Sequence, residues 1–148
     1  MFWEAIGFDG PKLLVKCPQR MNSDGYVAIL QIFAENVFGK KFLFQQDNAP
    51  IHKSGKTRRF FEDQNWTTLD WPPYSPDLNL IENLWAILKK NVHADPVFYE
   101  NLEEKIRSAW NSISPVVIHK LFESMPKRIE EVIRKKEETH KVLICYLL

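Results

Sequence analysis

A proline-rich stretch in the middle of the chain separates two parts with different patterns. Residues 70–76 read Asp-Trp-Pro-Pro-Tyr-Ser-Pro. Proline fixes φ and has no amide proton, so this stretch cannot be a helix. Short apolar runs alternate with amphipathic segments before it, whereas the pattern after it is helical. We therefore predict an α/β part, a rigid loop and a helical C-terminal part.

The part before the loop is predicted to hold four short strands and two helices. The apolar runs Phe2–Phe8 and Leu13–Cys17 flank Asp9-Gly10, a dipeptide that suits the positive φ of a tight hairpin turn. Capping residues after Met21 begin an amphipathic helix that closes near Gly39. The other expected elements are a buried strand over 42–46, a helix over 54–64 and a strand over 66–69.

The part after the loop is predicted to be a series of helices. They are expected at roughly 79–91, 99–112, 115–124 and 126–139, with a proline at the start of each of the last two. The apolar run 142–148 has seven residues, and a membrane-spanning helix needs about 20. We therefore expect no membrane span and interpret this run as a docking tail or as read-through sequence.

Composition excludes two broad classes of protein. The 148 residues suit one domain, and 20 Lys+Arg against 19 Asp+Glu give a formal net charge of +1. A strongly basic nucleic-acid-binding domain is excluded, so any contact with nucleic acid must come from a local patch. Cys17 and Cys145 are too few and too far apart for a disulfide framework, and no CxxC pair suggests zinc.

Two carboxylates are the candidates for chemistry. Asp47 follows a predicted buried strand, and Glu82 falls in the first turn of the helix after the proline-rich loop. Open α/β sheets place ligand-binding groups at the carboxyl ends of their strands. Two carboxylates there would suit Mg²⁺, which commonly binds one or two carboxylates together with phosphate oxygens. Such a site supports in-line phosphoryl displacement.

Local patterning alone favours structural roles for both residues. Asp47, in Asp-Asn-Ala-Pro, fits a turn residue that hydrogen-bonds its own backbone. Glu82 lies three residues after Asn79, which is the spacing of a capping box, and the helix dipole favours an acid there. Neither residue is a specific signal by itself.

Two long blocks of sequence carry a family resemblance. Residues 46–52 read Gln-Asp-Asn-Ala-Pro-Ile-His, and residues 69–85 read Leu-Asp-Trp-Pro-Pro-Tyr-Ser-Pro-Asp-Leu-Asn-Leu-Ile-Glu-Asn-Leu-Trp. Both blocks resemble the catalytic core of Tc1/mariner-type transposases, and the interval from Asp47 to Glu82 resembles the Tc1 branch. The segments 21–30 and 124–128 are similar to that branch as well, so the resemblance covers roughly residues 1–138. Leu80 stands where the family usually has proline, which we expect to loosen the start of the helix.

The resemblance implies an RNase H-like fold and metal-dependent DNA cleavage and strand transfer by an acidic triad. Asp47 would be the second acid and Glu82 the third, both as ligands of Mg²⁺ or Mn²⁺. The implied partner is transposon-end DNA, with a second copy or an intact transposase as a protein partner, and the implied location is the nucleus. Residues 1–138 would form a partial catalytic domain and residues 139–148 an apolar tail.

The first acid of the family's triad has no match in this sequence. In the family it lies on a strand upstream of the segment that the opening hairpin resembles. Asp9 falls in the predicted turn and Asp24 at a helix cap, while Glu4 lies on a predicted strand but matches no acidic position of the family, so none of them replaces it. We expect the chain to lack the first, central strand and not to cleave DNA alone. The sheet would close across the gap, keep open edges, or accept a strand from a partner.

A run of basic residues follows the Asp47 turn. Residues 53–59 read Lys-Ser-Gly-Lys-Thr-Arg-Arg, with four positive charges and no acid. DNA phosphates would approach such a patch, although a solvated helix face gives the same pattern. The DNA-contact candidates are His52, Lys53, Lys56, Arg58 and Arg59, and His52 fits the role of orienting the loop equally well. Two other functions stay open: a non-catalytic module that binds nucleic acid or protein, and a transposon relic without present function.

Overall fold

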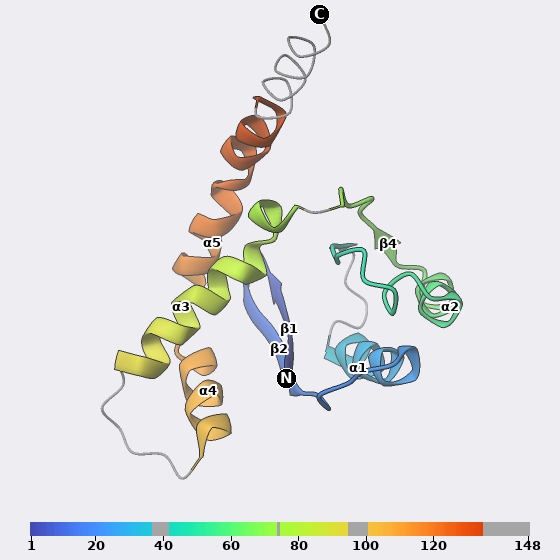
Figure 1. Ribbon diagram of the computed structural model, residues 1–148, viewed down its shortest axis with the longest axis horizontal. Coiled ribbons are helices and arrows are strands. Elements are labelled where there is room, and N and C mark those ends of the chain that lie inside the picture. Colours follow the sequence, from blue (N-terminus) through green and yellow to red (C-terminus); the bar gives the residue numbers. More distant parts are fainter. Residues whose placement is uncertain (37–41, 74, 95–100, 135–148) are drawn as a thin grey trace, which may run out of the picture. The chain divides into compact units, whose positions relative to one another are not determined.

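The computed structural model describes residues 1–36, 42–73, 75–94 and 101–134 (Figure 1). The predicted boundary at residue 138 and the apolar tail at 139–148 lie outside these ranges. The strands are β1 (Phe2–Gly7), β2 (Gly10–Lys16), β3 (Leu43–Phe44) and β4 (Thr67–Thr68). The helices are α1 (Ser23–Asn36), α2 (Gly55–Asp63), the 3₁₀ turn η1 (Pro76–Leu78), α3 (Leu80–Ala94), α4 (Leu102–Asn111) and α5 (Pro115–Glu123), and residues 125–134 are also helical. The predicted order of elements is confirmed.

The opening hairpin forms where the turn dipeptide predicts it. Strands β1 and β2 pair in a two-stranded sheet. Gly10 has a φ of +128°, which a residue with a side chain rarely adopts, so the glycine of Asp9-Gly10 is required there. At the open end of the hairpin, the Cys17 amide donates a hydrogen bond to the Met1 carbonyl at 2.9 Å.

Side-chain caps begin the first two helices. The side-chain oxygen of Asn22 accepts a hydrogen bond from the Gly25 amide at 2.9 Å, just before α1. The Ser54 hydroxyl accepts one from the Thr57 amide at 3.2 Å at the start of α2. Each cap satisfies an amide that has no partner inside its own helix. The predicted helix starts are confirmed to within two residues.

The second sheet is shorter than the sequence predicts. Strands β3 and β4 are parallel, with Leu43 opposite Thr67 and Phe44 opposite Thr68. Strand β3 pairs with β4, and β1 pairs only with β2, so the described residues contain two separate two-stranded sheets. Within those residues the two pairs of strands do not join into one sheet, so the first of the three expected outcomes is not observed.

The chain divides into two compact units. The first contains Met1–Ala5 and Lys12–Ser75, and the second contains Ile6–Pro11 and the chain from Pro76 onward. The boundary between Ser75 and Pro76 falls in the proline-rich loop, where the sequence pattern changes from α/β to helical.

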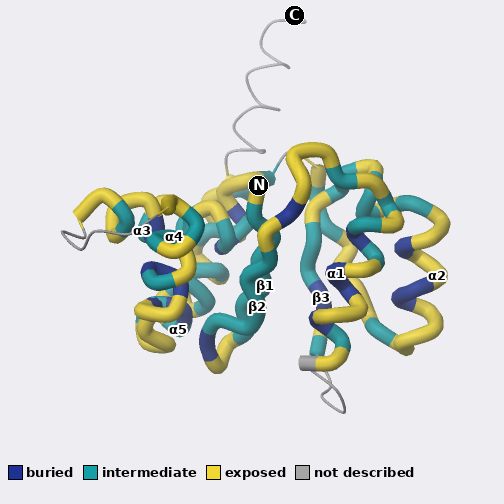
Figure 2. Tube along the Cα trace, turned by 90° about the horizontal axis from the view of Figure 1, so that it is seen from below, coloured by how far each residue is buried: buried dark blue, intermediate teal, exposed yellow. Residues whose placement is uncertain are grey.

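An aromatic cluster forms the core of the first unit. The Trp66 ring lies between 5.0 and 5.8 Å, centroid to centroid, from five phenylalanine rings. These rings come from α1, from the segment around β3 and from α2, and they are Phe33, Phe42, Phe44, Phe60 and Phe61. Figure 2 shows the buried positions of α1, α2 and β3 in dark blue. Edge-to-face and stacked rings therefore fix both helices against the short strand.

Helix α3 is the centre of the second unit. It packs against both α4 and α5, and it contributes the fully buried Leu84 and Leu88. Leu80, at the position where the family usually has proline, is only 6% exposed. The leucine therefore adds apolar packing at the helix start, which offsets the loosening expected from the loss of proline. None of the described helices is long and apolar enough to cross a membrane.

Replacing Phe44 with alanine should destabilise the first unit strongly. Phe44 is 8% exposed, and its loss would leave a cavity among the rings around Trp66. We expect Phe44→Ala to lower the free energy of unfolding by about 3–5 kcal/mol, measured by urea denaturation. The control is Leu43→Ala, one residue earlier and 53% exposed, for which we expect a change within about 0.5 kcal/mol. Equal effects of the two variants would contradict the packing described above.

Candidate functional site

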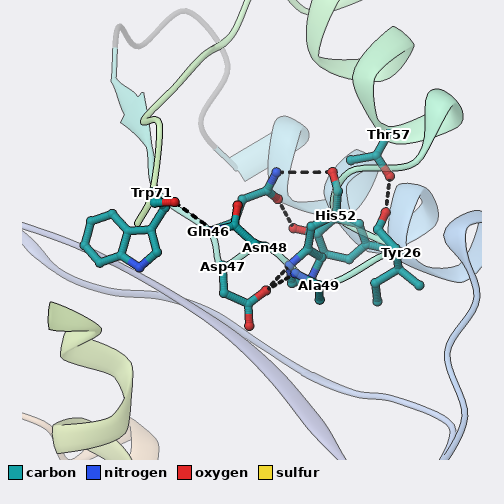
Figure 3. Close-up of polar contacts among 9 residues, drawn as sticks. Tyr26, Gln46, Asp47, Asn48, Ala49, His52, Thr57 and Trp71 are labelled. Carbon is teal, nitrogen blue, oxygen red and sulfur yellow. Dashed lines mark hydrogen bonds and ion pairs between the residues drawn. The ribbon is translucent and has the colours of Figure 1, made fainter. Parts of the chain in front are cut away.

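Asp47 lies in the loop that directly follows β3, and one of its two oxygens is fixed by local contacts. Its Oδ1 accepts a hydrogen bond from the Ala49 amide at 2.9 Å and contacts His52 Nδ1 at 2.6 Å (Figure 3). The first contact is the turn role that local patterning favours. The Asp47 side chain is nonetheless 58% exposed. The turn therefore holds the carboxylate in place without burying it.

His52 contacts its surroundings through both its ring and its backbone carbonyl. Its ring lies 4.4 Å from the Tyr26 ring, centroid to centroid, and its backbone carbonyl accepts a hydrogen bond from Gln46 Nε2 at 3.4 Å. The Tyr26 hydroxyl in turn donates to Gln46 Oε1 at 2.7 Å. These contacts form a network around the Asp47 turn, so His52 has the orienting role that the sequence left open. Its contact with DNA stays a prediction.

Two further hydrogen bonds fasten the loop on either side. Asn48 Nδ2 donates to the Trp71 carbonyl at 2.7 Å, which joins the Asp47 turn to the proline-rich loop. The Thr57 hydroxyl, which is fully buried, donates to the Ile51 carbonyl at 2.6 Å and joins the turn to α2. Sequence reasoning missed both residues, although Asn48 lies within the block that carries the family resemblance.

Burial raises the pKa of Tyr26. The side chain is 1% exposed, and burial raises the pKa of its phenol far above the ordinary value of 10.0. The negative charge of Asp47 raises this pKa further, while a hydrogen bond with the Trp3 side chain opposes the increase. Tyr26 therefore stays protonated and remains a hydrogen-bond donor to Gln46 at any physiological pH.

The second oxygen of Asp47 is available for a ligand. Both contacts of the carboxylate use Oδ1, and no described residue forms a hydrogen bond with Oδ2. An exposed carboxylate oxygen is a suitable ligand for Mg²⁺ or Mn²⁺, so the donor chemistry fits a divalent cation. Among the residues that the structure describes, no three His, Cys, Asp or Glu side chains form a group that would hold a metal ion.

Glu82 lies in the first turn of α3 and has an exposed carboxylate. Asn79 caps this helix, because its side-chain oxygen accepts a hydrogen bond from the Ile81 amide at 3.2 Å. In a full capping box the Glu82 carboxylate would bond back to the Asn79 amide. No such bond forms, and no described residue donates a hydrogen bond to this carboxylate. Glu82 is thus also available for a ligand.

Arg128, in the helical segment 125–134, forms hydrogen bonds with the residues at the start of α3. Its Nη1 donates to the Asp77 carbonyl at 2.9 Å and to Asn83 Oδ1 at 2.7 Å. Its Nε donates to the Ser124 hydroxyl at 2.8 Å, which fixes the guanidinium. Arg128 is thus half-buried and bonded to residues far from it in the sequence. The only sequence signal was the resemblance of residues 124–128 to the family.

The predicted site residues divide between the two units. Asp47, His52 and the basic residues belong to the first unit, and Glu82 belongs to the second. The convergence of Asp47 with Glu82 therefore stays a prediction. The basic side chains are exposed on α2 or just before it, and the Arg58 guanidinium donates to the Lys53 carbonyl at 3.3 Å.

Comparison with known proteins identifies the class. The model of the DDE superfamily endonuclease family matches residues 4–104. The chain is 42% identical over 122 residues to the Tc3 transposase of Caenorhabditis elegans, covering 78% of this chain and 37% of that protein. It is 43% identical over 101 residues to the Tc1 transposase of the same organism, covering 64% of this chain and 35% of that protein. The chain thus spans little more than a third of the length of these relatives.

The fold agrees with this classification. The catalytic domain of the Mos1 mariner transposase superposes with a TM-score of 0.74 at 20% identity, over 86% of this chain and 69% of that one. This likeness confirms the RNase H-like fold. The chain belongs to the DDE superfamily endonuclease family. Within that family it is a fragment of a Tc1/mariner-type transposase catalytic domain.

Tyr26→Phe should change how stability depends on pH. A phenol whose pKa is raised by folding stabilises the protein below the pKa of the unfolded chain, and this stabilisation is lost as pH rises above it. The wild-type chain should therefore lose stability above about pH 10, and Tyr26→Phe should show a smaller loss in urea unfolding between pH 8 and pH 11. At neutral pH the variant should be less stable by about 0.5–1.5 kcal/mol, because the bond to Gln46 is lost. Parallel alkaline slopes in the two proteins would contradict the assignment.

Arg128→Ala should loosen the first turn of α3. Three hydrogen bonds from one guanidinium are lost, and we expect a fall of about 1–3 kcal/mol in the stability of the second unit. Amide hydrogen exchange should be faster at Glu82 and Asn83. The matched control is Lys127→Ala, one residue earlier and exposed, which should leave exchange at α3 unchanged. Protection at Glu82 that survives Arg128→Ala would refute this role.

Proposed function

We propose that this chain is a transposase catalytic-domain fragment that binds DNA and a divalent cation but does not cleave DNA alone. The observation that carries the proposal is the geometry of the Asp47 carboxylate. Its Oδ1 is held by Ala49 and His52, its Oδ2 bonds no described residue, and the side chain is 58% exposed. Among the described residues, the turn contacts hold Oδ1 and leave Oδ2 accessible to a ligand. The similarity of this chain to the Tc1 and Tc3 transposases supports a role in DNA chemistry.

Asp47 and Glu82 are the residues that would hold the cation. Both are exposed carboxylates, and each carries an oxygen that no described residue engages. The Mos1 catalytic domain has been solved with Mg and with Mn, which supports the same choice of ions here. A bound divalent ion would supply charge stabilisation for phosphoryl transfer. The contribution of the chain is to position the carboxylates, through His52 for Asp47 and through Arg128 for the α3 turn.

DNA contact is assigned to the basic residues around α2. His52, Lys53, Lys56, Arg58 and Arg59 are close in sequence to the Asp47 turn, and the four cations have exposed side chains. A Mos1 transposase structure contains a transposon end, which supports transposon-end DNA as the partner. We further propose a nuclear location, where such DNA lies. Association with a second copy or an intact transposase fits the two short sheets, whose edge strands are available for pairing.

We expect no cleavage because we infer that this chain contributes two of the family's three carboxylates. Two carboxylates supply less negative charge than two divalent ions need for stable binding, so the chemistry of a two-metal site would not be supported. We infer that Asp9 and Asp24 do not supply the family's first acid, since Asp9 belongs to the hairpin turn and Asp24 to the first turn of α1.

A plasmid-nicking assay tests the proposal. The chain should bind duplex DNA in a salt-dependent manner but leave supercoiled plasmid intact with Mg²⁺ or Mn²⁺. Asp47→Asn should abolish any residual nicking, while Asp63→Asn, an exposed carboxylate at the end of α2, should not. Robust nicking that is lost in Asp47→Asn would show that two carboxylates suffice and would refute the expected inactivity.

A non-catalytic binding module is the second candidate function. The basic residues of α2 make no contact with Asp47 among the described side chains, so they would bind DNA whether or not the carboxylate holds a cation. DNA affinity that is insensitive both to Mg²⁺ and to Asp47→Asn would favour this function. Affinity that rises with Mg²⁺ only when Asp47 is present would favour the first.

A further inference from the structure

The basic residues of α2 do not form a single surface. Lys56 and Arg59 are three residues apart and so share one face of the helix. Both line an open cleft of about 430 Å³ in the first unit, whereas Lys53 and Arg58 lie outside its lining. The opposite wall of the cleft is the start of α1, including Ser23 and Asp24.

One of the two cations already forms an ion pair with an acidic side chain. Asp24 Oδ1 lies 2.5 Å from Lys56 Nζ, although both side chains are more than 60% exposed. Exposed ion pairs of this kind contribute little net stability, because water solvates the separated charges well. Arg59, by contrast, makes no hydrogen bond or ion pair with any described residue. Among the residues that the structure describes, Arg59 is thus unpaired, and Lys56 is paired with a carboxylate that is easily displaced.

We propose that this cleft binds a backbone phosphate of DNA and that Asp24 competes with that phosphate for Lys56. Two cations on one helix face attract a backbone phosphate, whose two unesterified oxygens can each accept a charge-assisted hydrogen bond. The Asp24 carboxylate carries the same charge as a phosphodiester and holds Lys56 while no DNA is bound. When a phosphate enters between Lys56 and Arg59, the Asp24–Lys56 pair breaks and the carboxylate returns to solvent.

The proposal rests on DNA binding by this chain and makes Asp24 a negative regulator of affinity. A simple basic patch would predict only that removing cations weakens binding. Competition predicts in addition that removing one particular acid strengthens it. The effect should be local, because an exposed charge farther than about a Debye length is largely screened at 0.1 M salt.

The experiment measures the affinity for a random-sequence DNA duplex by fluorescence anisotropy from 50 to 300 mM salt. Arg59→Ala should weaken binding several-fold and reduce the slope of log affinity against log salt by about 1, the value for one lost phosphate contact. Asp24→Asn should tighten binding several-fold. The matched control is Glu35→Gln, which makes the same change of charge at the other end of α1, and it should leave affinity nearly unchanged.

Each outcome decides a separate question. Equal strengthening by Asp24→Asn and Glu35→Gln would reduce the effect to net charge and overturn the competition. Wild-type binding that neither Arg59→Ala nor Asp24→Asn alters would place DNA elsewhere on the chain, while leaving the proposed DNA-binding function intact. Absence of any salt-dependent binding by the wild-type chain would overturn both. Circular dichroism of each variant identifies a loss that arises from misfolding, and Arg59→Lys, which keeps the charge, should then restore most of the affinity.

Discussion

The packing of Trp66 against the rings of α1, α2 and β3 is the contact on which the candidate site depends. Strand β3 has two residues and one parallel partner, so backbone pairing alone would not hold it. Phe44 supplies what the hydrogen bonds do not, because its ring stacks on Trp66 at 5.8 Å and 15°. Asp47 follows only three residues later. A shift of this strand would move the carboxylate with it.

Polar contacts then turn a fixed strand end into an oriented carboxylate. Asp47 would rotate freely if only its backbone were held, but Ala49 and His52 both engage Oδ1. His52 is held in turn by Tyr26 and Gln46, and the protonated Tyr26 hydroxyl donates a hydrogen bond to Gln46. The buried end of this chain of contacts is rigid and the exposed end carries the free oxygen. The core therefore fixes the orientation of the Asp47 carboxylate, and its surface position keeps it accessible.

Local sequence patterns predicted the elements of this fold well and its side-chain contacts poorly. Gly10 and the caps Asn22 and Ser54 act within a few residues of their own position, so their signals are visible in the sequence. The predicted strands were longer than β3 and β4 because an apolar run does not reveal how much of it finds a partner. The Arg128 bond to Asp77 spans 51 residues, and no periodicity encodes such a contact. The carboxylates of Asp47 and Glu82 were identified through family resemblance, since turn and cap chemistry explained both residues equally well.

The Arg128 bridge gives the last described helix an influence on a loop encoded much earlier in the reading frame. A premature stop codon or frameshift after residue 120 would still leave intact codons for Asp47, Glu82 and every basic residue of α2. The polypeptide made from such a copy would nonetheless lack the guanidinium that secures Asp77 and Asn83. Shortened versions of this chain that retain all the motif residues would therefore differ in the order of the α3 turn, according to whether they include Arg128.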